Sequence, residues 1–422
     1  MKSTFFLSFL CIGFLTANAQ KSNTSASAKV HSPKNKDSAA MKHVLDLKNI
    51  EHTYLAMNDY FPSKTVAKAA KPFVLPKVKN GTLPVDFTHN ATTYNTLKFI
   101  DSSYTQGFIF IQNDTIQYEN YWRGQSEAIK HISWSMSKSY VSALFGIAID
   151  EGYIKSINQT VDEYLPELKG SGYEGVKIKD VLQMASGIKF DENYSDPNAD
   201  INVYWNGFVS GKSQDKFAST LINQRPPGTL NHYVSINTHV LAMIIVKATG
   251  KSLTDYLQEK IWKRIGTEYD AYWLVDGEGM EMALGGLNAC LRDYAKLGLL
   301  YLNKGNYKGT QIVPKAWIES STTATEPYLM PGDINSPNPA TGYGYQWWLP
   351  ASTESEFMAI GVFNQYIYIN PTTRTVIVKN AANQNYYDGT NPYRSTDVHL
   401  ALFRKLAHLK DVKQQSKTKS KK

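Results

Sequence analysis

The sequence predicts an α+β fold, in which an antiparallel β-sheet is flanked by helices and carries a mostly helical insert. Strand-forming runs lie early and late in the chain, around residues 107–122 and 357–379. Helical patterns fill most of residues 150–300 between them. Because the strands are not interleaved with helices as βαβ units, we expect the early and late strands to join one sheet.

The elements can be placed in order along the chain. A short helical stretch around residues 43–60 precedes an irregular segment at 71–90, which is rich in proline, glycine and lysine. The turn Asn113-Asp114 joins two strand-like runs as a hairpin. A proline-, asparagine- and threonine-rich stretch at 322–342 predicts a loop close to the functional site. The remaining expected elements are helices at 140–150, 176–187, 239–249, 293–302 and 397–408 and strands at 357–361, 365–369 and 375–379.

The two ends of the chain differ in composition from its body. The first 19 residues combine Lys2, an apolar run and Ala17-Asn18-Ala19, the pattern of a secretory signal peptide that is cleaved after Ala19. We therefore expect a secreted or periplasmic protein, without a membrane span because the apolar run is too short. The expected divisions are a signal peptide at 1–19, a disordered linker at 20–45, one folded domain at 46–409 (sheet part about 85–132 and 343–409, helical part about 150–300) and a basic disordered tail at 410–422.

Charge and cysteine content exclude several classes of function. The formal net charge is +8, but the basic residues crowd at the ends and form no stripe beside aromatic residues, so we expect no nucleic-acid binding. Cys11 lies in the signal peptide, which leaves Cys290 as the only cysteine of the mature chain and excludes an internal disulfide. The histidines show no spacing typical of zinc ligands, so we expect neither a metal nor a cofactor.

The strongest chemical signal is Ser135-Met136-Ser137-Lys138, which leads into an apolar helix. Residues three apart share a helix face, so the Lys138 amine can reach the Ser135 hydroxyl. A serine hydroxyl needs an adjacent base to act as a nucleophile, and burial lowers the pKa of a lysine so that it can be that base. Most Ser-x-x-Lys sequences are ordinary helix starts, but the wholly apolar helix that follows favours a buried pair.

Further motifs follow the Ser-x-x-Lys sequence in a specific order. Tyr233-Val234-Ser235 comes after a turn, and Phe190–Pro197 precedes it. The other matching motifs are Gly285–Ala289, Arg292–Gly298 and Gly342–Trp348. Over roughly residues 85–405 the chain resembles the penicillin-recognising serine hydrolases, as a class C β-lactamase-related protein most similar to the 6-aminohexanoate-dimer hydrolase and esterase branch. The resemblance implies a β-lactamase/transpeptidase-like fold.

The resemblance also implies a role for each matching residue. Ser135 would be the nucleophile, Lys138 its proton acceptor, and Tyr233 the group that passes the proton to the leaving group. Because the pKa of a phenol lies near 10, we expect the Lys138 charge to lie close to Tyr233 and to lower it. Tyr194 would hold an amide substrate. The alternative for both tyrosines is an ordinary packing or loop position.

The third motif of the family is usually Lys-Thr-Gly, and its best counterpart here is Ala359-Ile360-Gly361. Gly361 would let the substrate backbone approach, and the N–H of Val362 would pair with that of Ser135 as the oxyanion hole. The chain lacks the lysine that grips the carboxylate of a penicillin, and Ser235 replaces the usual asparagine. The expected substrate-binding residues are Tyr194, Ser235, Ile360, Gly361 and Tyr343, with Trp205 and Trp347 as further aromatic walls.

These features lead us to expect a serine hydrolase of carboxylesterase or amidase type that cleaves a small ester or amide through an acyl-enzyme on Ser135. Two alternatives stay open: a penicillin-sensitive D-peptidase or β-lactamase, and a non-catalytic cell-envelope binding module of the same fold. The chain has no Gly-x-Ser-x-Gly elbow. Gly211-Lys212-Ser213 lacks the first glycine and the preceding strand of a phosphate loop. Nothing in the sequence indicates the oligomeric state.

Overall fold

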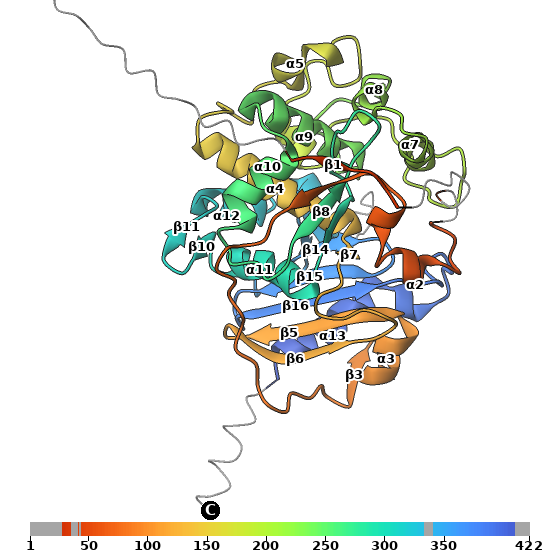
Figure 1. Ribbon diagram of the computed structural model, residues 1–422, viewed down its shortest axis with the longest axis vertical. Helices are drawn as coiled ribbons and strands as arrows, with labels where there is room; N and C mark the ends of the chain where they lie inside the picture. The colour runs from red at the N-terminus through yellow and green to blue at the C-terminus, as the bar shows by residue number, and fades with distance from the viewer. Residues whose placement is uncertain (1–27, 35–40, 42–43, 333–340, 410–422) are drawn as a thin grey trace, which may run out of the picture.

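Early and late strands form one antiparallel sheet in the computed structural model, which describes residues 28–34, 41, 44–332 and 341–409 (Figure 1). The predicted arrangement is therefore confirmed. The early strands are β5 (Thr105–Gln112) and β6 (Thr115–Tyr121), and β5 pairs with the late strand β16 (Thr375–Ala381). The seven-stranded order is β12-β13-β14-β15-β16-β5-β6, with β12 at Thr341–Tyr343, β13 at Trp348–Pro350, β14 at Phe357–Gly361 and β15 at Gln365–Asn370.

The sheet is covered on both faces, which explains why β5 and β16 are buried along their whole length. Successive side chains of a strand point to opposite faces. Phe108 and Phe110 accordingly pack in a cluster with α13 (Thr396–Ala407), and Ile109 and Ile111 belong to the main core on the other side. The helical part of the chain lies above the sheet in the view of Figure 1.

Two long helices form the centre of the helical part. α4 (Ser137–Asp150) and α9 (Ile236–Thr249) are buried around almost their whole circumference. Gly250 ends α9 with a φ of 67°, the left-handed conformation that favours glycine. The other helices are α2 (Ile50–Thr53), η1 (Met57–Asp59), α3 (Thr96–Ser102), η2 (Trp134–Met136), α5 (Val161–Tyr164), η3 (Pro166–Leu168), α6 (Ile178–Leu182), α7 (Asp200–Val209), α8 (Gln214–Ser219), α10 (Leu253–Leu257), η4 (Gln258–Trp262), α11 (Leu291–Leu302), α12 (Lys315–Ser321), η5 (Pro327–Leu329) and η6 (Pro392–Arg394).

A second, five-stranded sheet was not predicted. Its strands have two to four residues each, too few to show a period of two in the sequence. Its order is β1-β2-β8-β9-β7, with β1 at Val30–His31, β2 at Ser63–Val66, β8 at Ala271–Leu274, β9 at Leu287–Ala289 and β7 at His131–Ile132. Two short hairpins complete the strands: β3 (Asp86–His89) with β4 (Thr92–Asn95), and β10 (Asn306–Tyr307) with β11 (Thr310–Gln311).

The start of the chain departs from the expected divisions. Part of the expected linker, Val30–His31, forms β1 and pairs with β2. Val44 is fully buried in the main core, so packing begins before residue 46. The predicted helix at 43–60 is two short helices instead, α2 and η1. The predicted signal peptide, the basic tail and positions 333–340 of the predicted loop lie outside the described residues.

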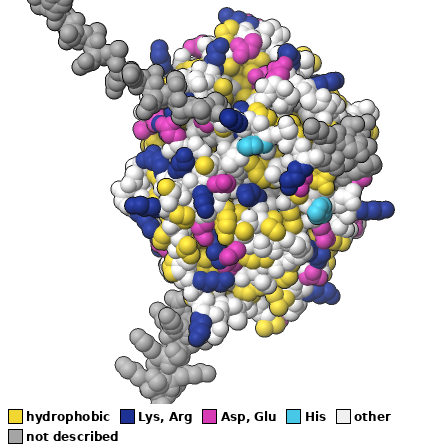
Figure 2. Space-filling model, in the orientation of Figure 1, with side chains coloured by type: hydrophobic (Ala, Val, Ile, Leu, Met, Phe, Trp, Pro, Cys, Tyr) yellow, Lys and Arg dark blue, Asp and Glu magenta, His cyan; other side chains and the backbone are white. Residues whose placement is uncertain are grey.

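The surface carries no gathered basic stripe on the face that Figure 2 shows. Lysine and arginine side chains are scattered there among acidic and uncharged ones. In the portion of the chain that the structure describes, no helix is long and apolar enough to cross a membrane.

The contact between α11 and the sheet depends on a glycine. A Cβ added to Gly298 would lie 2.6 Å from Cγ1 of Val376 and 3.2 Å from Cγ2 of Ile367. Both distances are shorter than normal van der Waals contact, so we expect Gly298→Ala to lower the free energy of unfolding by about 1–3 kcal/mol.

Gly207 of α7 is the matched control, because a Cβ there would meet its nearest atom at 3.9 Å. Gly207→Ala is expected to stabilise the protein by about 0.5–1 kcal/mol, the helix penalty of glycine. The midpoints of guanidinium-induced unfolding of the two variants, compared with that of wild type, test both expectations. Equal stability of Gly298→Ala and wild type would contradict the close packing of α11 on the sheet.

Candidate active site

Ser135 and Lys138 meet at the junction of η2 and α4. The Lys138 Nζ atom lies 2.8 Å from Ser135 Oγ and 2.7 Å from the backbone oxygen of Leu284. The Lys138 side chain is 1% exposed, and burial lowers its pKa to about 7. At neutral pH much of the amine is therefore uncharged. An N–H of this amine donates to the Leu284 carbonyl, which leaves the nitrogen lone pair free to accept the Ser135 proton.

The turn that carries Ser135 is held in an unusual conformation. Trp134 has a φ of 44°, in the left-handed region that bulky residues rarely adopt. Side-chain and backbone hydrogen bonds fix this turn: Ser133 Oγ donates to the Trp134 carbonyl at 3.0 Å, and Ser137 Oγ donates to the Ala283 carbonyl at 2.8 Å. The strained conformation persists because these neighbours determine it, as is common where a reactive side chain has to be presented.

Tyr233 lies next to this pair, as predicted. Its hydroxyl is in hydrogen-bonding contact with the Ser135 side chain, and Lys138 Nζ lies 5.3 Å from the centre of its ring. The ring stacks on Trp348 at a centroid distance of 5.3 Å, and Tyr343 meets it edge-on at 6.2 Å. These aromatic contacts fix the direction of the phenol.

The pKa of Tyr233 moves in the opposite direction from the one expected. Burial raises it well above its ordinary value, and the nearby Glu192 carboxylate raises it further. The hydrogen-bonding contacts with Ser135 and Ser235 lower it only in part. Tyr233 therefore stays protonated and is suited to donate a proton, and Lys138 is the better base.

The predicted oxyanion-hole groups lie where β14 ends beside η2. Among the described residues, neither the Ser135 N–H nor the Val362 N–H makes a backbone hydrogen bond. Gly361 precedes Val362, and a Cβ on it would lie 2.6 Å from the Ser133 carbonyl oxygen. Its missing side chain therefore admits the turn of the nucleophile. Two free N–H groups at this place can hold a negatively charged oxygen.

Glu192 is a site residue that the sequence analysis did not single out. Its Oε1 accepts a hydrogen bond from the Ser235 backbone N–H at 2.6 Å, and its Oε2 accepts one from the Tyr194 hydroxyl at 3.3 Å. Burial raises the pKa of Glu192, and the Lys138 amine lowers it in part. In return, its charge opposes the lowering of the Lys138 pKa. The only signal in the sequence was its place two residues before Tyr194.

Ser235 contacts Glu192 and Tyr233, and it does not contact Lys138. It is 1% exposed, and its side chain is in hydrogen-bonding contact with both of these groups. The hydrogen bonds of Lys138 go to Ser135 and Leu284 instead. The shorter serine side chain thus does not supply the hydrogen bond to Lys138 that is expected of the asparagine usual at this position.

Two cavities meet at Ser135. They share Ser135, Tyr194 and Val362 as walls. One has a volume of about 200 Å³, and its other lining residues are Glu192, His232, Tyr233, Trp348, Ile360 and Tyr386. The second has a volume of about 60 Å³, and its other lining residues are Leu45, Trp134, Ile201, Asn202, Tyr204, Trp205, Met282, Leu284, Phe363 and Tyr387.

Some of the substrate-binding residues expected from the sequence line the two cavities, and others do not. Tyr194, Ile360 and Trp205 line them, whereas Ser235, Gly361 and Tyr343 do not. Trp347 is fully buried against Tyr301 at a ring distance of 4.4 Å. Its neighbour Trp348 forms the wall instead, because adjacent residues at the start of a strand point in opposite directions.

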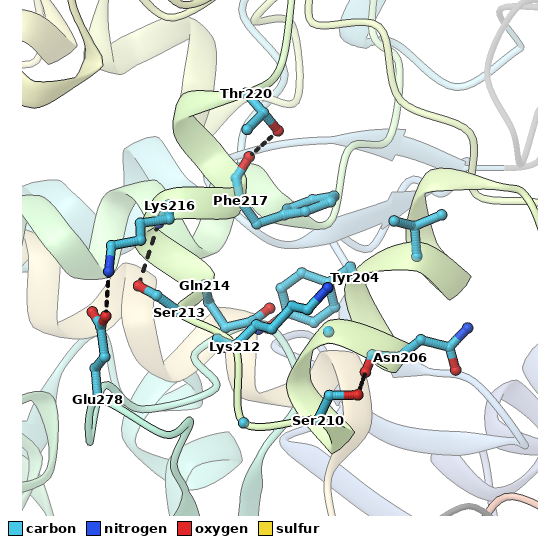
Figure 3. A pocket seen from close by; sticks show the side chains of 13 residues that line it. Tyr204, Asn206, Ser210, Lys212, Ser213, Gln214, Lys216, Phe217, Thr220 and Glu278 are labelled. Atoms are coloured by element: carbon cyan, nitrogen blue, oxygen red, sulfur yellow. Dashed lines mark hydrogen bonds and ion pairs between the residues drawn. The ribbon is translucent and has the colours of Figure 1, made fainter.

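A larger hollow of about 690 Å³ lies between α7 and α8 (Figure 3). It contains the Gly211-Lys212-Ser213 sequence, in which Lys212 is exposed and Ser213 caps α8. Lys216 forms an ion pair with Glu278 at 2.6 Å. None of these groups forms a nucleophile–base pair. Across the whole described part of the chain, no group of three or more His, Cys, Asp or Glu residues is arranged to hold a metal ion.

Comparison with known proteins places the chain in a defined group. The β-lactamase family profile matches residues 109–403. The 6-aminohexanoate-dimer hydrolase of Paenarthrobacter ureafaciens is 31% identical over 288 residues, which are 66% of this chain and 73% of that protein. A Bacillus anthracis structure described as a 6-aminohexanoate-dimer hydrolase superposes with a TM-score of 0.76 at 25% identity, covering 90% of this chain and 98% of that one. A family VIII carboxylesterase shares the fold, with a TM-score of 0.54 at 15% identity over 74% of this chain and 96% of that one.

The lowered pKa of Lys138 predicts how the reactivity of Ser135 depends on pH. Below about pH 7 the amine is protonated and cannot accept the serine proton. We expect the rate constant for reaction of Ser135 with a fluorophosphonate, followed by intact mass, to fall about tenfold per pH unit on the acidic side and to level off on the alkaline side. A rate that stays constant down to about pH 5 would exclude Lys138 as the base.

Proposed function

The chain belongs to the β-lactamase family of serine hydrolases, and on this premise we propose that it hydrolyses a carboxylic ester or amide through an acyl-enzyme on Ser135. The observation that carries the proposal is the 2.8 Å contact between Lys138 Nζ and Ser135 Oγ. Because burial lowers the pKa of Lys138 to about 7, this contact pairs the hydroxyl with a base rather than with a cation.

In the first stage the Ser135 Oγ attacks the substrate carbonyl carbon while its proton passes to the Lys138 amine. The carbonyl oxygen becomes negatively charged and is held by the N–H groups of Ser135 and Val362. Tyr233 then donates its proton to the departing oxygen or nitrogen and takes one back from Lys138. The bond to the leaving group breaks, and the acyl group stays on Ser135.

In the second stage water takes the place of the leaving group. It loses a proton along the same route, through Tyr233 to Lys138, as its oxygen attacks the acyl carbon. The ester bond to Ser135 breaks, the carboxylic acid is released, and Ser135 Oγ regains a proton from Lys138. Both stages therefore use the same residues, and no cofactor enters either of them.

The charge of the site favours esters and simple amides over penicillins. Among the described residues that line the two cavities, Glu192 is the one acid and no lysine or arginine is present. The carboxylate of a penicillin, or of a peptide end, would meet a negative charge there. The relative named a 6-aminohexanoate-dimer hydrolase supports the amide branch of the proposal.

We further place the protein outside the cytoplasm, as a secreted or periplasmic enzyme. The support is the signal-like composition of its first 19 residues. N-terminal sequencing of the exported protein tests this placement, with Gln20 expected as the first residue after cleavage.

Replacement of the nucleophile is the primary test of the function. Wild type is expected to form one fluorophosphonate adduct and to hydrolyse p-nitrophenyl acetate, and Ser135→Ala is expected to lose both. Tyr233→Phe is expected to turn the ester over about 10²–10⁴-fold more slowly, because it lacks the hydroxyl that passes the proton of the attacking water to Lys138 in the second stage. Ser142→Ala on the same helix is the matched control, since Ser142 lines neither cavity and its side chain contacts Tyr301 rather than Ser135, Lys138 or Tyr233.

Two results would redirect the proposal. Absence of an adduct on folded wild type would favour the non-catalytic binding module. Stoichiometric labelling by a fluorescent penicillin, with little ester turnover, would favour the D-peptidase or β-lactamase alternative.

A further inference from the structure

The position of Tyr233 assigns the two cavities that meet at Ser135 to different parts of a substrate. Tyr233 lines the 200 Å³ cavity and does not line the 60 Å³ cavity. A proton donor has to lie within hydrogen-bond reach of the atom that it protonates. The leaving group therefore departs into the cavity of Tyr233, and the acyl group has to occupy the other one.

We propose that the 60 Å³ cavity beside Trp134 is the acyl-binding site, and that it selects short, uncharged acyl groups. We call it the acyl cavity. This inference rests on the proposed acyl-enzyme at Ser135, and it adds the class of substrate.

The size of the acyl cavity limits the length of the acyl chain. Its volume is about 60 Å³. A protein cavity of roughly 150 Å³ holds a benzene molecule, which corresponds to roughly 25 Å³ for each carbon atom. The acyl cavity therefore has room for about two or three carbons beyond the carbonyl group. Acetyl to butyryl groups fit, and longer chains collide with its walls.

The walls of the acyl cavity determine the charge that it accepts. Aromatic and aliphatic side chains surround it, and none of its described lining residues is charged. An ammonium or carboxylate placed there would lose its hydration and find no ionic partner, which is costly. The 6-aminohexanoyl group carries a terminal ammonium on a five-methylene chain, so we do not expect it to fit.

Trp205 forms a wall of the acyl cavity that a substitution can remove. It belongs to α7, is partly exposed, and meets Trp134 edge-on at a ring distance of 5.8 Å. Phe61 and Phe208 pack against it at 5.6 Å and 5.8 Å. Removing the indole would lengthen the acyl cavity without touching Ser135, Lys138 or Tyr233.

A second wall comes from outside the part of the chain that matches the family. Leu45 lines the acyl cavity, and the family match covers residues 109–403. The N-terminal segment therefore closes the acyl cavity with a residue that lies outside the stretch matched by the family profile.

The cavity of the leaving group differs from the acyl cavity in both size and charge. It is larger, at about 200 Å³, and it contains the Glu192 carboxylate. Amines and other hydrogen-bond donors are favoured beside a carboxylate, and anionic leaving groups are disfavoured. The expected substrates are thus short-chain esters or amides with a bulkier, uncharged or cationic leaving group.

The test is a series of p-nitrophenyl esters that differ in acyl length, measured as kcat/KM. Wild type is expected to prefer acetyl and butyryl over octanoyl by at least about tenfold. Trp205→Ala is expected to raise the octanoyl-to-acetyl ratio by at least about tenfold. Ile360→Ala is the matched control, since Ile360 lines the other cavity alone and its loss should leave this ratio unchanged.

A second measurement avoids the risk that Trp205→Ala folds poorly. The probes are p-nitrophenyl phosphonates that carry a methyl or an octyl group on phosphorus, in the place of the acyl chain. The rates at which they label wild-type Ser135 report the same preference without any substitution in the protein. We expect the methyl compound to react at least about tenfold faster.

Several results would overturn the inference while the acyl-enzyme proposal stands. They are equal turnover of acetyl and octanoyl esters by wild type, an unchanged ratio in folded Trp205→Ala, and cleavage of the 6-aminohexanoate linear dimer as fast as that of a butyryl ester. Failure of every ester and phosphonate to react with Ser135 would instead overturn the acyl-enzyme proposal, and this inference with it.

Discussion

The burial of the Lys138 amine makes the chemistry proposed for Ser135 feasible. A lysine in water is charged at neutral pH and cannot accept the proton of a serine. Here α4 is surrounded by other elements, and the amine is 1% exposed, so its pKa falls to about 7. The long helix α9 and the 283–287 segment contribute to this lowering of the Lys138 pKa as well as to stability. They exclude water from the amine, and the Leu284 carbonyl aims it at Ser135.

Burial and a neighbouring charge have opposite effects on the pKa of Lys138. Burial lowers the pKa of Lys138, and the Glu192 carboxylate raises it, so that the balance lies close to neutral pH. The same two causes both raise the pKa of Tyr233 and keep its proton in place. One group is thereby poised to accept a proton and its neighbour to donate one, which an acyl transfer needs at the two ends of the scissile bond.

The site also depends on a close approach between elements that are far apart in the chain. The end of β14 lies against the turn of Ser135, and the bare Cα of Gly361 makes this approach sterically feasible. Ser135 and Val362 then line the same two cavities. Leu45 and Tyr387, from near the two ends of the described chain, close the small cavity at this junction. The specificity of the site is therefore set by segments that the catalytic motifs do not include.

The helices, strands and residue pairs that depend on local spacing could be predicted from the sequence. Runs of strand-forming residues specified β5, β14, β15 and β16, helical periods specified α4, α9 and α11, and the three-residue interval brought Ser135 and Lys138 together. The ordered motifs also identified Tyr233. Five features could not be predicted in this way: the place of Glu192 in the site, the direction of the Tyr233 pKa shift, the steric reason for Gly361, the five-stranded sheet and the two cavities. These features arise from burial and from contacts between distant segments, and local spacing carries no information about which distant side chains will exclude water from a given group.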